Sequence, residues 1–335
     1  MMIEVKNILV VRFRQLGDAI LTTPLLNTLR RNFPGAQIHY VLNQRITPLF
    51  EGHPSVDRVI PFTDDELHHT AVYLRKVWRI VHATHYDVII DKRSTLNSTP
   101  FVLFSLHTPI RVALAKPYTW LLYNYRVGRV ANMPMIDHIL AHLKPLERVK
   151  PLTYVREMTL FVSQTERETF GKYLQQHGVS LSRPIMLVGV TAKLESKTWP
   201  REKMTEVLRR FISRFPGVQI IFNYAPGREE QNARDIWHRL ASPSAVLIDV
   251  QASSSRQLAA MSTFIDIYFG NEGGARHIVH AMRRPSLVVC SPVANPDVWI
   301  PKDEVPAQAI ENKDATVDHV WQQLEQFTLK HVKQL

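Results

Sequence analysis

Runs of apolar residues alternate along this chain with segments in which apolar and polar positions follow a helical period. In the first half, apolar runs of strand length stand at residues 7–13, 37–42, 87–91 and 110–114. In the second half, similar runs stand near residues 185–191, 218–224, 245–250, 264–269 and 286–290. Strands that alternate with helices predict an α/β fold, with parallel sheets covered by helices on both faces.

A repeated pattern indicates that the two halves are built alike. Phe-Pro-Gly-x-Gln-Ile occurs at residues 33–38 and again at 215–220, each time between a helical pattern and an expected strand. The glycine of each copy fits the turn that ends a helix. We therefore expect two Rossmann-like domains in tandem, and the expected boundaries are residues 1–165 and 183–315, with a C-terminal helix at 316–335.

The bulk composition is that of a globular protein: 335 residues, of which 45% are hydrophobic and 21% charged. No apolar run reaches the roughly 20 residues that span a bilayer. Glu4 and Lys6 interrupt the N-terminus, which does not resemble a signal peptide. The single cysteine, Cys290, excludes an intrachain disulfide and agrees with a cytoplasmic location.

The positive charge is concentrated in the first half. The net charge is +11, and residues 1–160 carry 20 Lys and Arg against 12 Asp and Glu, whereas the remainder carries 21 against 18. Such an excess suits an anionic partner, but long-range attraction does not distinguish nucleic acid, acidic lipid headgroups and phosphorylated glycans. A generally basic, soluble surface accounts for the same numbers.

The turn after the first expected strand reads RFRQLGDAI, at residues 12–20. A dinucleotide-binding turn carries G-x-G-x-x-G so that backbone N–H groups can approach a pyrophosphate. Here Gly17 stands alone and is followed by Asp18, whose carboxylate repels phosphate. Asp18 therefore has two interpretations, a helix N-cap or a general base at the carboxyl end of the sheet.

The segment FGNEGGARHIVHAM, at residues 269–282, predicts a strand that ends at Phe269, a glycine-rich turn and a helix that begins near Ala275. The N-terminus of such a helix binds anions, because free N–H groups and the helix dipole favour negative charge there. A diphosphate therefore fits this turn without a metal ion. A tight strand-to-helix connection is the alternative interpretation of the same glycines.

Lys197, in the motif SKTWP after the first strand of the second half, is a candidate cation for a leaving diphosphate. Pro200 is expected at the first position of the helix that follows. Thr191 stands at the end of the same strand and offers a hydroxyl to phosphate. Glu229 or Glu230, after the motif YAPG, is a candidate acceptor of hydrogen bonds from ribose hydroxyls. The alternative is that each is simply an acid that stabilises the first turn of a helix.

Four motifs, in this order and spacing, carry a resemblance to a known family: ILVVRFRQLGDAILTTPLL, SKTWP, YAPGREEQNA and GNEGGARHIVHAM. They resemble those of the heptosyltransferases of glycosyltransferase family 9, which add heptose to the inner core of lipopolysaccharide. The resemblance covers nearly the whole chain. It implies the GT-B architecture, two Rossmann-like domains that face each other across a cleft, and an inverting transfer that needs no metal or other cofactor.

The resemblance also assigns roles to residues. Asp18 corresponds to the family's catalytic base, and Lys197 matches its Lys-x-Trp-Pro pattern. The donor, ADP-heptose by this resemblance, is expected to contact Thr191, Glu229, Glu230, Glu272, Gly273, Gly274, Ala275 and Arg276. Family members usually have Asp followed by Ser or Thr where this chain has Glu272 and Gly273, a departure that concerns the identity of the donor.

A lipopolysaccharide core acceptor is the second partner that the resemblance implies, beside an anionic inner-membrane surface and without nucleic acid. Arginine binds planar oxyanions such as carboxylates and phosphates in bidentate fashion. The expected acceptor residues are Arg12, Arg14, Gly17, Lys92, Arg93 and Arg126. Peripheral attachment to the cytoplasmic face of the inner membrane follows from the same partner, while scattered surface charge is the other interpretation of these cations.

Two other kinds of protein share this two-domain plan. A sugar-nucleotide epimerase or hydrolase converts the donor without an acceptor. A catalytically silent relative binds nucleotide or glycan and never turns over, and the departure at Glu272 and Gly273 keeps this alternative open.

Overall fold

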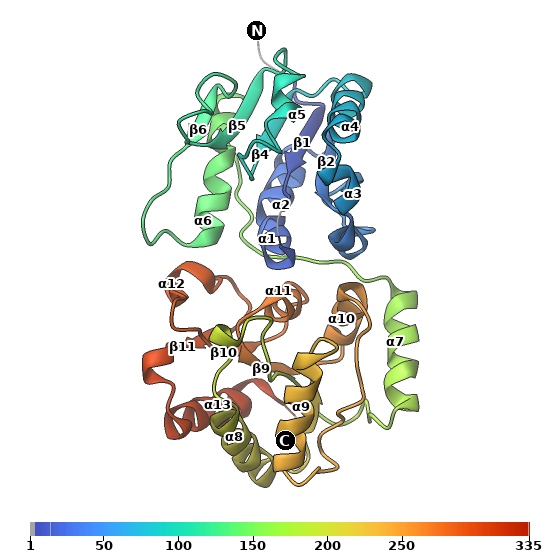
Figure 1. Cartoon of the computed structure of the whole chain (residues 1–335), viewed down its shortest axis with the longest axis vertical. Coiled ribbons are helices and arrows are strands. Elements are labelled where there is room, and N and C mark those ends of the chain that lie inside the picture. The colour runs from blue at the N-terminus through green and yellow to red at the C-terminus, as the bar shows by residue number, and fades with distance from the viewer. Residues whose placement is uncertain (1–3, 14, 334) are drawn as a thin grey trace. The chain divides into compact units, whose positions relative to one another are not determined.

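Six parallel strands form the sheet of the first half of the chain (Figure 1). The computed structural model describes residues 4–13, 15–333 and 335. In it the chain divides into two compact units, unit 1 ending at Phe161 and unit 2 beginning at Val162. The strands of unit 1 follow the order β3-β2-β1-β4-β5-β6. Their bounds are β1 Asn7–Val11, β2 Gln37–Asn43, β3 Arg58–Phe62, β4 Val88–Asp91, β5 Ile110–Leu114 and β6 Tyr125–Val127.

Helices connect these strands, as parallel pairing requires. The α-helices of unit 1 are α1 Leu16–Leu21, α2 Thr23–Asn32, α3 Asp64–His68, α4 Thr70–Ala83, α5 Pro100–Leu103 and α6 Met135–Leu140. Two 3₁₀ helices are Gln44–Phe50 and Ala141–Arg148. An aromatic cluster fills one face of the sheet, where Phe13, just after β1, packs edge-on against Phe62 with ring centroids 5.2 Å apart. This packing fixes the chain immediately before the Gly-Asp turn.

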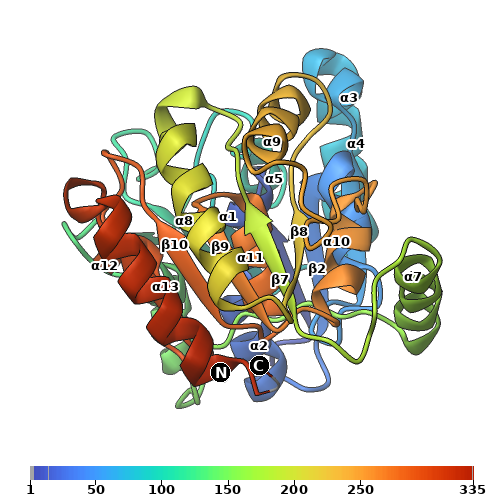
Figure 2. The ribbon, with the colours of Figure 1, turned by 90° about the horizontal axis from the view of Figure 1, so that it is seen from below.

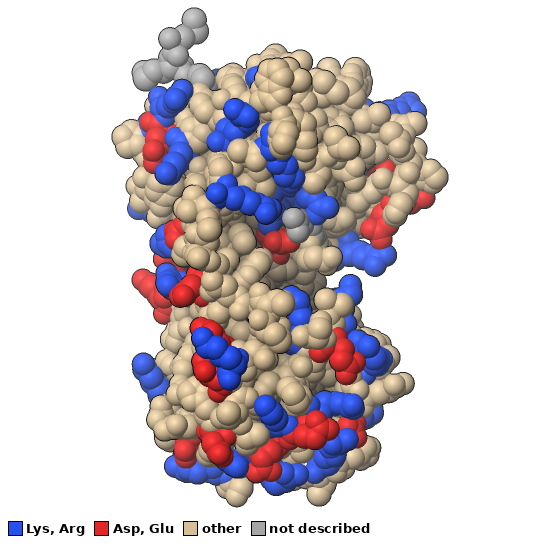
Figure 3. All heavy atoms as spheres, turned by 60° about the vertical axis from the view of Figure 1, so that its left-hand side comes forward, with Lys and Arg blue, Asp and Glu red and all other residues tan. Residues whose placement is uncertain are grey.

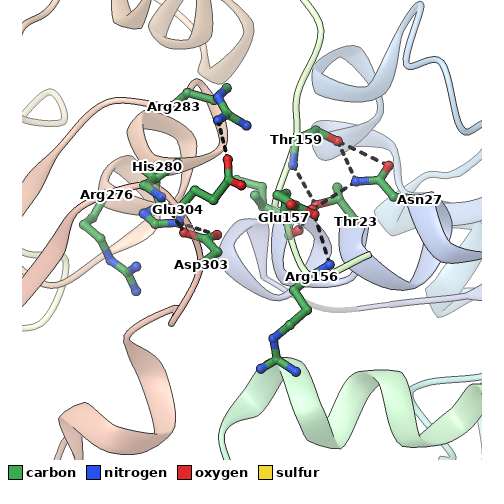
Figure 4. Close-up of polar contacts among 12 residues, drawn as sticks. Thr23, Asn27, Arg156, Glu157, Thr159, Arg276, His280, Arg283, Asp303 and Glu304 are labelled. Atoms are coloured by element: carbon green, nitrogen blue, oxygen red, sulfur yellow. Dashed lines mark hydrogen bonds and ion pairs between the residues drawn. The ribbon is translucent and has the colours of Figure 1, made fainter. Parts of the chain in front are cut away.

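The last segment of unit 1 runs extended along α2. Asn27 Nδ2 donates to Thr159 Oγ1 at 2.9 Å and to the Glu157 carbonyl at 3.0 Å, and the Thr159 N–H donates to Thr23 Oγ1 at 3.1 Å (Figure 4). These bonds satisfy backbone groups of a segment that has no sheet partner. They also hold α2, and with it the end of α1, in a fixed place.

Unit 2 contains a second parallel sheet, of five strands in the order β11-β10-β9-β7-β8. Its strands are β7 Ile185–Gly189, β8 Gln219–Phe222, β9 Ile267–Asn271, β10 Ser286–Val289 and β11 Ala307–Ile310. Its helices are α7 Gln164–Gln176, α8 Arg201–Arg214, α9 Arg228–Arg239, α10 Ser255–Ser262, α11 Gly274–Ala281, α12 Pro296–Trp299 and α13 Val317–His331, with 3₁₀ helices at Glu195–Lys197 and Asn312–Asp314. Helices α8 and α13 lie side by side on the sheet (Figure 2).

The repeated Phe-Pro-Gly segments fold alike. Helix α2 ends at Asn32 and α8 at Arg214, and the phenylalanine that follows each helix has φ −126° with ψ 67° at Phe33 and 64° at Phe215. In both copies the amide three residues on, at Ala36 or Val218, donates back to the phenylalanine carbonyl. Each segment thus ends the long helix between the first two strands of its unit and leads into the second strand, as the sequence predicts.

The expected strand at residues 245–250 is wrong. Only Val246 makes a bridge, to Ile220, and the segment otherwise turns. Three strands have no counterpart among the sequence predictions: β3, β6 and β11. They lie at sheet edges, where one side of the strand lacks a partner and a continuous apolar run is not required.

Pro200 is also placed differently from the expectation. It is the N-cap residue of α8 rather than its first helical residue. The helix begins at Arg201, because Pro200 itself has an extended ψ of 131°. Among the described residues, no helix combines the length and apolarity that crossing a bilayer requires.

Candidate functional site

The Gly-Asp turn lies at the carboxyl end of β1, in the middle of the unit 1 sheet. Helix α1 begins at Leu16, its N-cap residue is Gln15, and Asp18 is therefore the third helical residue. The capping interpretation of Asp18 is wrong, because an N-cap side chain must precede the helix to reach the free N–H groups. Gly17 is the second residue of α1.

Asp18 is held by a buried arginine. Arg12 Nη2 donates to Asp18 Oδ1 at 2.8 Å, and Arg12 Nη1 donates to the carbonyl of Lys92 at 2.8 Å. The Arg12 side chain is 7% exposed and that of Asp18 is 17% exposed. Arg12 therefore fixes the carboxylate of Asp18, and its expected contact with the acceptor stays a prediction.

Lys92 is buried as well, 3% exposed at the end of β4. Its Nζ lies 3.2 Å from Nδ1 of His142, on the 3₁₀ helix Ala141–Arg148. Burial, with the nearby charge of Arg12, places the pKa of Lys92 well below its usual range, and burial lowers the pKa of His142 in the same way. The expected contact of Lys92 with the acceptor stays a prediction; the structure buries its side chain, and its carbonyl accepts the hydrogen bond from Arg12.

The remaining expected acceptor residues differ in their surroundings. Arg93 Nη1 donates to the Phe13 carbonyl at 2.7 Å, which joins the ends of β1 and β4. Arg126 is exposed on β6. Arg14 lies outside the described residues.

Arg126 lines a pocket of about 440 Å³ that the sequence did not indicate. Lys144 and Arg148 contribute two more cations from the 3₁₀ helix Ala141–Arg148, and the Arg148 guanidinium lies 5.2 Å from the ring centre of Tyr125. Val127, Val130 and Met133 supply apolar walls. Among the described residues that line this pocket none is acidic, so it suits an anionic group that is attached to an apolar body.

In unit 2 the ends of β7 and β9 pass unusually close to each other. Gly270 has a φ of +136°, and a Cβ atom built on it would stand 2.4 Å from the carbonyl oxygen of Gly189. Asn271 Nδ2 donates to the same carbonyl at 2.9 Å and its Oδ1 accepts from the Trp199 N–H at 2.7 Å. These contacts bring the SKTWP segment against the turn that follows β9.

Lys197 and Glu272 meet at this junction. Lys197 Nζ lies 3.2 Å from Glu272 Oε1, and the same oxygen accepts a hydrogen bond from Ser291 Oγ at 2.8 Å. The Lys197 side chain is 43% exposed, whereas that of Glu272 is 19% exposed. The Lys197 ammonium group is therefore held by Glu272 and is still accessible to a ligand.

The two expected ribose ligands differ. Glu229 Oε2 accepts a hydrogen bond from Thr191 Oγ1 at 2.8 Å, so these two donor candidates are brought together. Glu230 instead pairs with Arg234, which also pairs with Asp249. Of the two acids, Glu229 is the one next to the strand end.

Helix α11 begins at Gly274, one residue before the expected start, and its N-cap is Gly273. No side chain caps this end, so the N–H groups of Gly274, Ala275 and Arg276 have no acceptor within the helix or from the cap residue. Such a helix end retains its capacity to bind an anion.

Arg276 places a buried cation in the same turn. It is 2% exposed, its Nη2 donates to the Trp299 carbonyl at 3.1 Å, and its Nε and Nη1 have no hydrogen-bond partner among the described residues. Burial lowers its pKa to about 10, so it stays protonated at neutral pH. Its side chain extends away from the buried pair of His280 and Asp303, which are 2.9 Å apart (Figure 4).

Among the described residues, no group of three or more His, Cys, Asp or Glu is placed to hold a metal ion. The acidic candidates of unit 2 each have protein partners: Thr191 for Glu229, Arg234 for Glu230, and both Lys197 and Ser291 for Glu272. What unit 2 offers at these strand ends is positive potential, from Lys197, Arg276 and the helix end.

Comparisons with known proteins show the family of this chain. Residues 74–301 match the family described as Glycosyltransferase family 9 (heptosyltransferase). Lipopolysaccharide heptosyltransferase 1 of Escherichia coli (strain K12) is 22% identical over 309 residues, which cover 85% of this chain and 88% of that protein.

Solved structures extend the likeness to the fold. The glycosyl transferase family 9 protein from Veillonella parvula DSM 2008 has a TM-score of 0.85 at 18% identity, covering 98% of this chain and 99% of that one. Two structures of an E. coli heptosyltransferase are also similar: the one with ADP has a TM-score of 0.73, and the one with ADP-2-deoxy-2-fluoro heptose has a TM-score of 0.70. Each is 16% identical and covers 96% of this chain and 99% of the other. The two parallel sheets, of six and five strands, are those of the GT-B fold.

Proposed function

Because the chain belongs to glycosyltransferase family 9, we propose that this glycosyltransferase moves heptose from ADP-heptose to a lipopolysaccharide core acceptor. The family match over residues 74–301 is the observation that supports this proposal most. The related E. coli enzyme, solved with ADP and with an ADP-heptose analogue, supports a nucleotide-sugar donor. The reaction inverts the configuration of the anomeric carbon.

In the proposed donor site, the diphosphate lies at the N-terminus of α11. Gly274, Ala275 and Arg276 offer backbone N–H groups, and the guanidinium of Arg276 has two further donors without a partner among the described residues. Lys197 neutralises the departing phosphate charge, and a preorganised cation does so without reorganisation at the moment of reaction. Glu229 accepts hydrogen bonds from the ribose hydroxyls, and the Thr191 hydroxyl contacts a phosphate oxygen.

In the proposed chemical step, Asp18 removes the proton from the acceptor hydroxyl. The hydroxyl oxygen forms a bond to the anomeric carbon of the heptose as the bond from that carbon to the ADP oxygen breaks on the opposite side. The products are the glycosylated acceptor and ADP, and the proton stays on Asp18 until water removes it. The ion pair with Arg12 keeps the carboxylate in its position.

The acceptor is proposed to present Kdo carboxylates or lipid A phosphates to unit 1. Arg126 and Arg93 remain candidates for direct contact, while Arg12 and Lys92 act through Asp18 and the end of β4. The glycolipid nature of such an acceptor implies a cytoplasmic protein that attaches peripherally to the inner membrane.

Incubation of the purified chain with ADP-heptose and a heptose-free core acceptor tests the proposal, with the acceptor mass followed by mass spectrometry. A gain of one heptose per acceptor, together with release of ADP, is the expected result. Consumption of the donor at the same rate without acceptor identifies an epimerase or hydrolase instead. Donor binding without conversion under both conditions identifies a silent binding protein.

A further inference from the structure

One stretch of unit 1 lacks acidic residues altogether. Residues 92–136 contain six Lys and Arg and no Asp or Glu, in a chain whose 335 residues include 30 acids. The acids that border the stretch are both engaged: Asp91 is fully buried and accepts a hydrogen bond from Tyr123, and Asp137 pairs with Arg156. The positive charge of the stretch is therefore not balanced by carboxylates of its own.

The same stretch exposes large apolar side chains. Ten large apolar side chains are exposed in the described part of unit 1, and seven of them belong to residues 92–136: Leu96, Leu103, Leu106, Tyr118, Trp120, Leu121 and Val130. Trp120 is 62% exposed, Leu121 68% and Leu96 76%. Exposed apolar side chains that are concentrated in one part of a structure mark an interaction surface, and here seven of ten fall within 45 consecutive residues. We call these seven residues the apolar face of unit 1.

Hydrogen bonds hold the loops of this face together. Tyr118 Oη donates to the Ser94 carbonyl at 2.7 Å, which joins the loop after β5 to the loop after β4. Arg111 donates to the carbonyls of Leu106 and Leu122, which joins the loop after α5 to the same β5–β6 connection. The exposed side chains are therefore presented by anchored backbone rather than by loose loops.

The tip of the β5–β6 connection shows how firmly they are presented. Thr119 is buried and its Oγ1 donates to the Leu114 carbonyl at 3.1 Å, while the Lys116 N–H donates to Thr119 Oγ1 at 3.0 Å. The next two residues, Trp120 and Leu121, point into solvent from this fixed turn. Insertion of these two side chains into a binding surface would cost little backbone conformational entropy, because the turn is already formed.

Basic side chains lie around the apolar residues. Arg126 and Arg129 are exposed next to Val130, and Lys116 precedes the turn that carries Trp120. Figure 3 shows a face of unit 1 on which blue Lys and Arg side chains lie among tan side chains across its middle. Exposed apolar and aromatic side chains with cations beside them match a bilayer whose headgroups are anionic, with tryptophan and tyrosine at the headgroup level.

We propose that the apolar face of unit 1 docks on an anionic lipid bilayer, with Trp120 and Leu121 inserted among the headgroups. This inference deepens the membrane association in the proposed function by naming the surface that makes it. A second copy of this chain, or a protein partner, would need acidic residues opposite the exposed cations Arg126 and Arg129, and the stretch itself offers none for a symmetric contact.

Sedimentation of the full-length protein with vesicles tests this proposal without any turnover. Wild type is compared with the double variant Trp120→Ser/Leu121→Ser on phosphatidylcholine vesicles with and without phosphatidylglycerol. The matched control is Val72→Ser/Trp78→Ser on α4, where both side chains are 50% exposed outside the stretch. We expect the partition constant on anionic vesicles to fall at least about tenfold for the first variant only, since two inserted apolar side chains are lost.

Fluorescence provides a second measurement that does not depend on the folding of the double variant. Brominated lipid in anionic vesicles is expected to quench the fluorescence of Trp120. This quenching should be absent in the variant Trp120→Phe and present in Trp78→Phe. Higher salt should weaken binding of the wild type and leave the quenching per bound molecule unchanged. Equal partition of both double variants and wild type, or a loss of self-association in Trp120→Ser/Leu121→Ser with vesicle binding intact, would overturn the proposal.

Because these measurements use lipid alone, their failure leaves the proposed transfer reaction untouched. Conversely, a chain that docks on vesicles and transfers no heptose would contradict the proposed function and retain the docking surface.

Discussion

At the scale of single residues, the Arg12–Asp18 pair is the feature that a local pattern does not predict. The sequence indicates Asp18 because a carboxylate at the end of a central strand is unusual for a nucleotide-binding turn. It does not indicate Arg12 as the partner, because that role depends on the Lys92 carbonyl, 80 positions away in the chain. Lys144 and Arg148 were missed for a similar reason, since no motif links them to Arg126 before the chain folds.

Asp18→Asn tests whether this carboxylate is the base. The amide keeps a hydrogen-bond acceptor for Arg12 but loses the charge, so the free energy of unfolding should fall by about 1–2 kcal/mol. Transfer should fall roughly 10²- to 10⁴-fold, the usual contribution of a positioned base, with ADP affinity unchanged. Single-turnover rate, calorimetric ADP binding and thermal melting on one preparation check these three expectations.

The matched control for Asp18→Asn is Asp137→Asn, which also removes the charge of an Asp–Arg pair in unit 1. It should lower stability by less than about 1 kcal/mol, because both partners are more than a third exposed, and leave transfer unchanged. Near-normal transfer by a folded Asp18→Asn variant would contradict the catalytic role.

Lys197→Met tests the cation for the leaving diphosphate. The ion pair with Glu272 is 43% exposed at the lysine, so its loss should change the free energy of unfolding by less than about 1 kcal/mol. Transfer should fall by roughly 10²- to 10³-fold and ADP should bind more weakly, as when one preorganised donor is removed from a transition state. Lys193→Met, an exposed lysine in the same loop, should retain both, and equal losses in the two variants would contradict the assignment.

At the scale of elements, prediction succeeded where burial dictates composition. Central strands such as β1 and β7 are buried on both faces, and their apolar runs were found. The edge strand β6 has three residues, none of them fully buried, and β11 reads AQAI, so neither has a run that separates it from a loop. Residues 245–250 show the converse, because apolar side chains that fill a core need not pair as a strand.

Gly270→Ala tests the close approach of β7 and β9 that positions the donor-site turn. A Cβ atom at a φ of +136° would meet backbone atoms of Gly189, which have no flexible end that can move aside. The free energy of unfolding should fall by more than about 2 kcal/mol, as chemical denaturation can measure.

Gly273→Ser is the companion of that variant. Gly273 has an extended φ of 167° and nothing within 4 Å of a built Cβ, so serine fits without a clash. Because serine and glycine differ by only a few tenths of a kcal/mol at an N-cap, stability should stay within about 0.5 kcal/mol of wild type. If Gly270→Ala is as stable as Gly273→Ser, the backbones of β7 and β9 can move apart to admit a Cβ atom at residue 270, which contradicts the prediction.

The attachment of α7 to α10 gives a pH-dependent prediction. Hydrogen bonds from the Arg256 guanidinium, at 2.6 and 2.7 Å, lower the pKa of Glu166 to about 2 from an ordinary value of 4.5. A carboxyl group whose pKa is lower in the folded state stabilises the fold above the unfolded value, and this contribution disappears as the pH falls from 4.5 towards 2. Since Glu166 is 35% exposed, we expect about 1 kcal/mol at pH 7.

Glu166→Gln checks that contribution, because glutamine retains the capping role towards Ser163 while losing the charge. The variant should unfold at a lower denaturant concentration at pH 7, and the difference from wild type should vanish as the pH approaches 2. A difference that stays constant across that range would mean that the ion pair is not its source.

At the scale of the whole molecule, the duplicated Phe-Pro-Gly turn was the most informative local signal, because one motif in two places predicts two Rossmann-like units. Both sheets then follow from the rule that a strand, a crossover helix and a parallel strand form a right-handed unit. The charge distribution along the chain, by contrast, indicated an anionic partner but not the apolar face, since that depends on which side chains the fold leaves exposed.

Insensitivity of transfer to EDTA is the prediction that concerns the molecule as a whole. Glycosyl transfer from a nucleotide sugar releases a diphosphate, and its charge must be neutralised by a bound divalent ion or by the protein itself. Unit 2 provides protein groups that can neutralise it, namely the ammonium of Lys197, the guanidinium of Arg276 and the uncapped start of α11. The nearby carboxylates of Glu229 and Glu272 are each engaged by protein donors, and Mg²⁺ binds through carboxylates that are free to coordinate it.

Initial rates with saturating ADP-heptose and acceptor should therefore be equal in EDTA and in Mg²⁺, and Lys197→Met should not be rescued by added Mg²⁺. Loss of activity in EDTA that Mg²⁺ or Mn²⁺ restores would assign the neutralising charge to a metal ion and leave Lys197 with a supporting part.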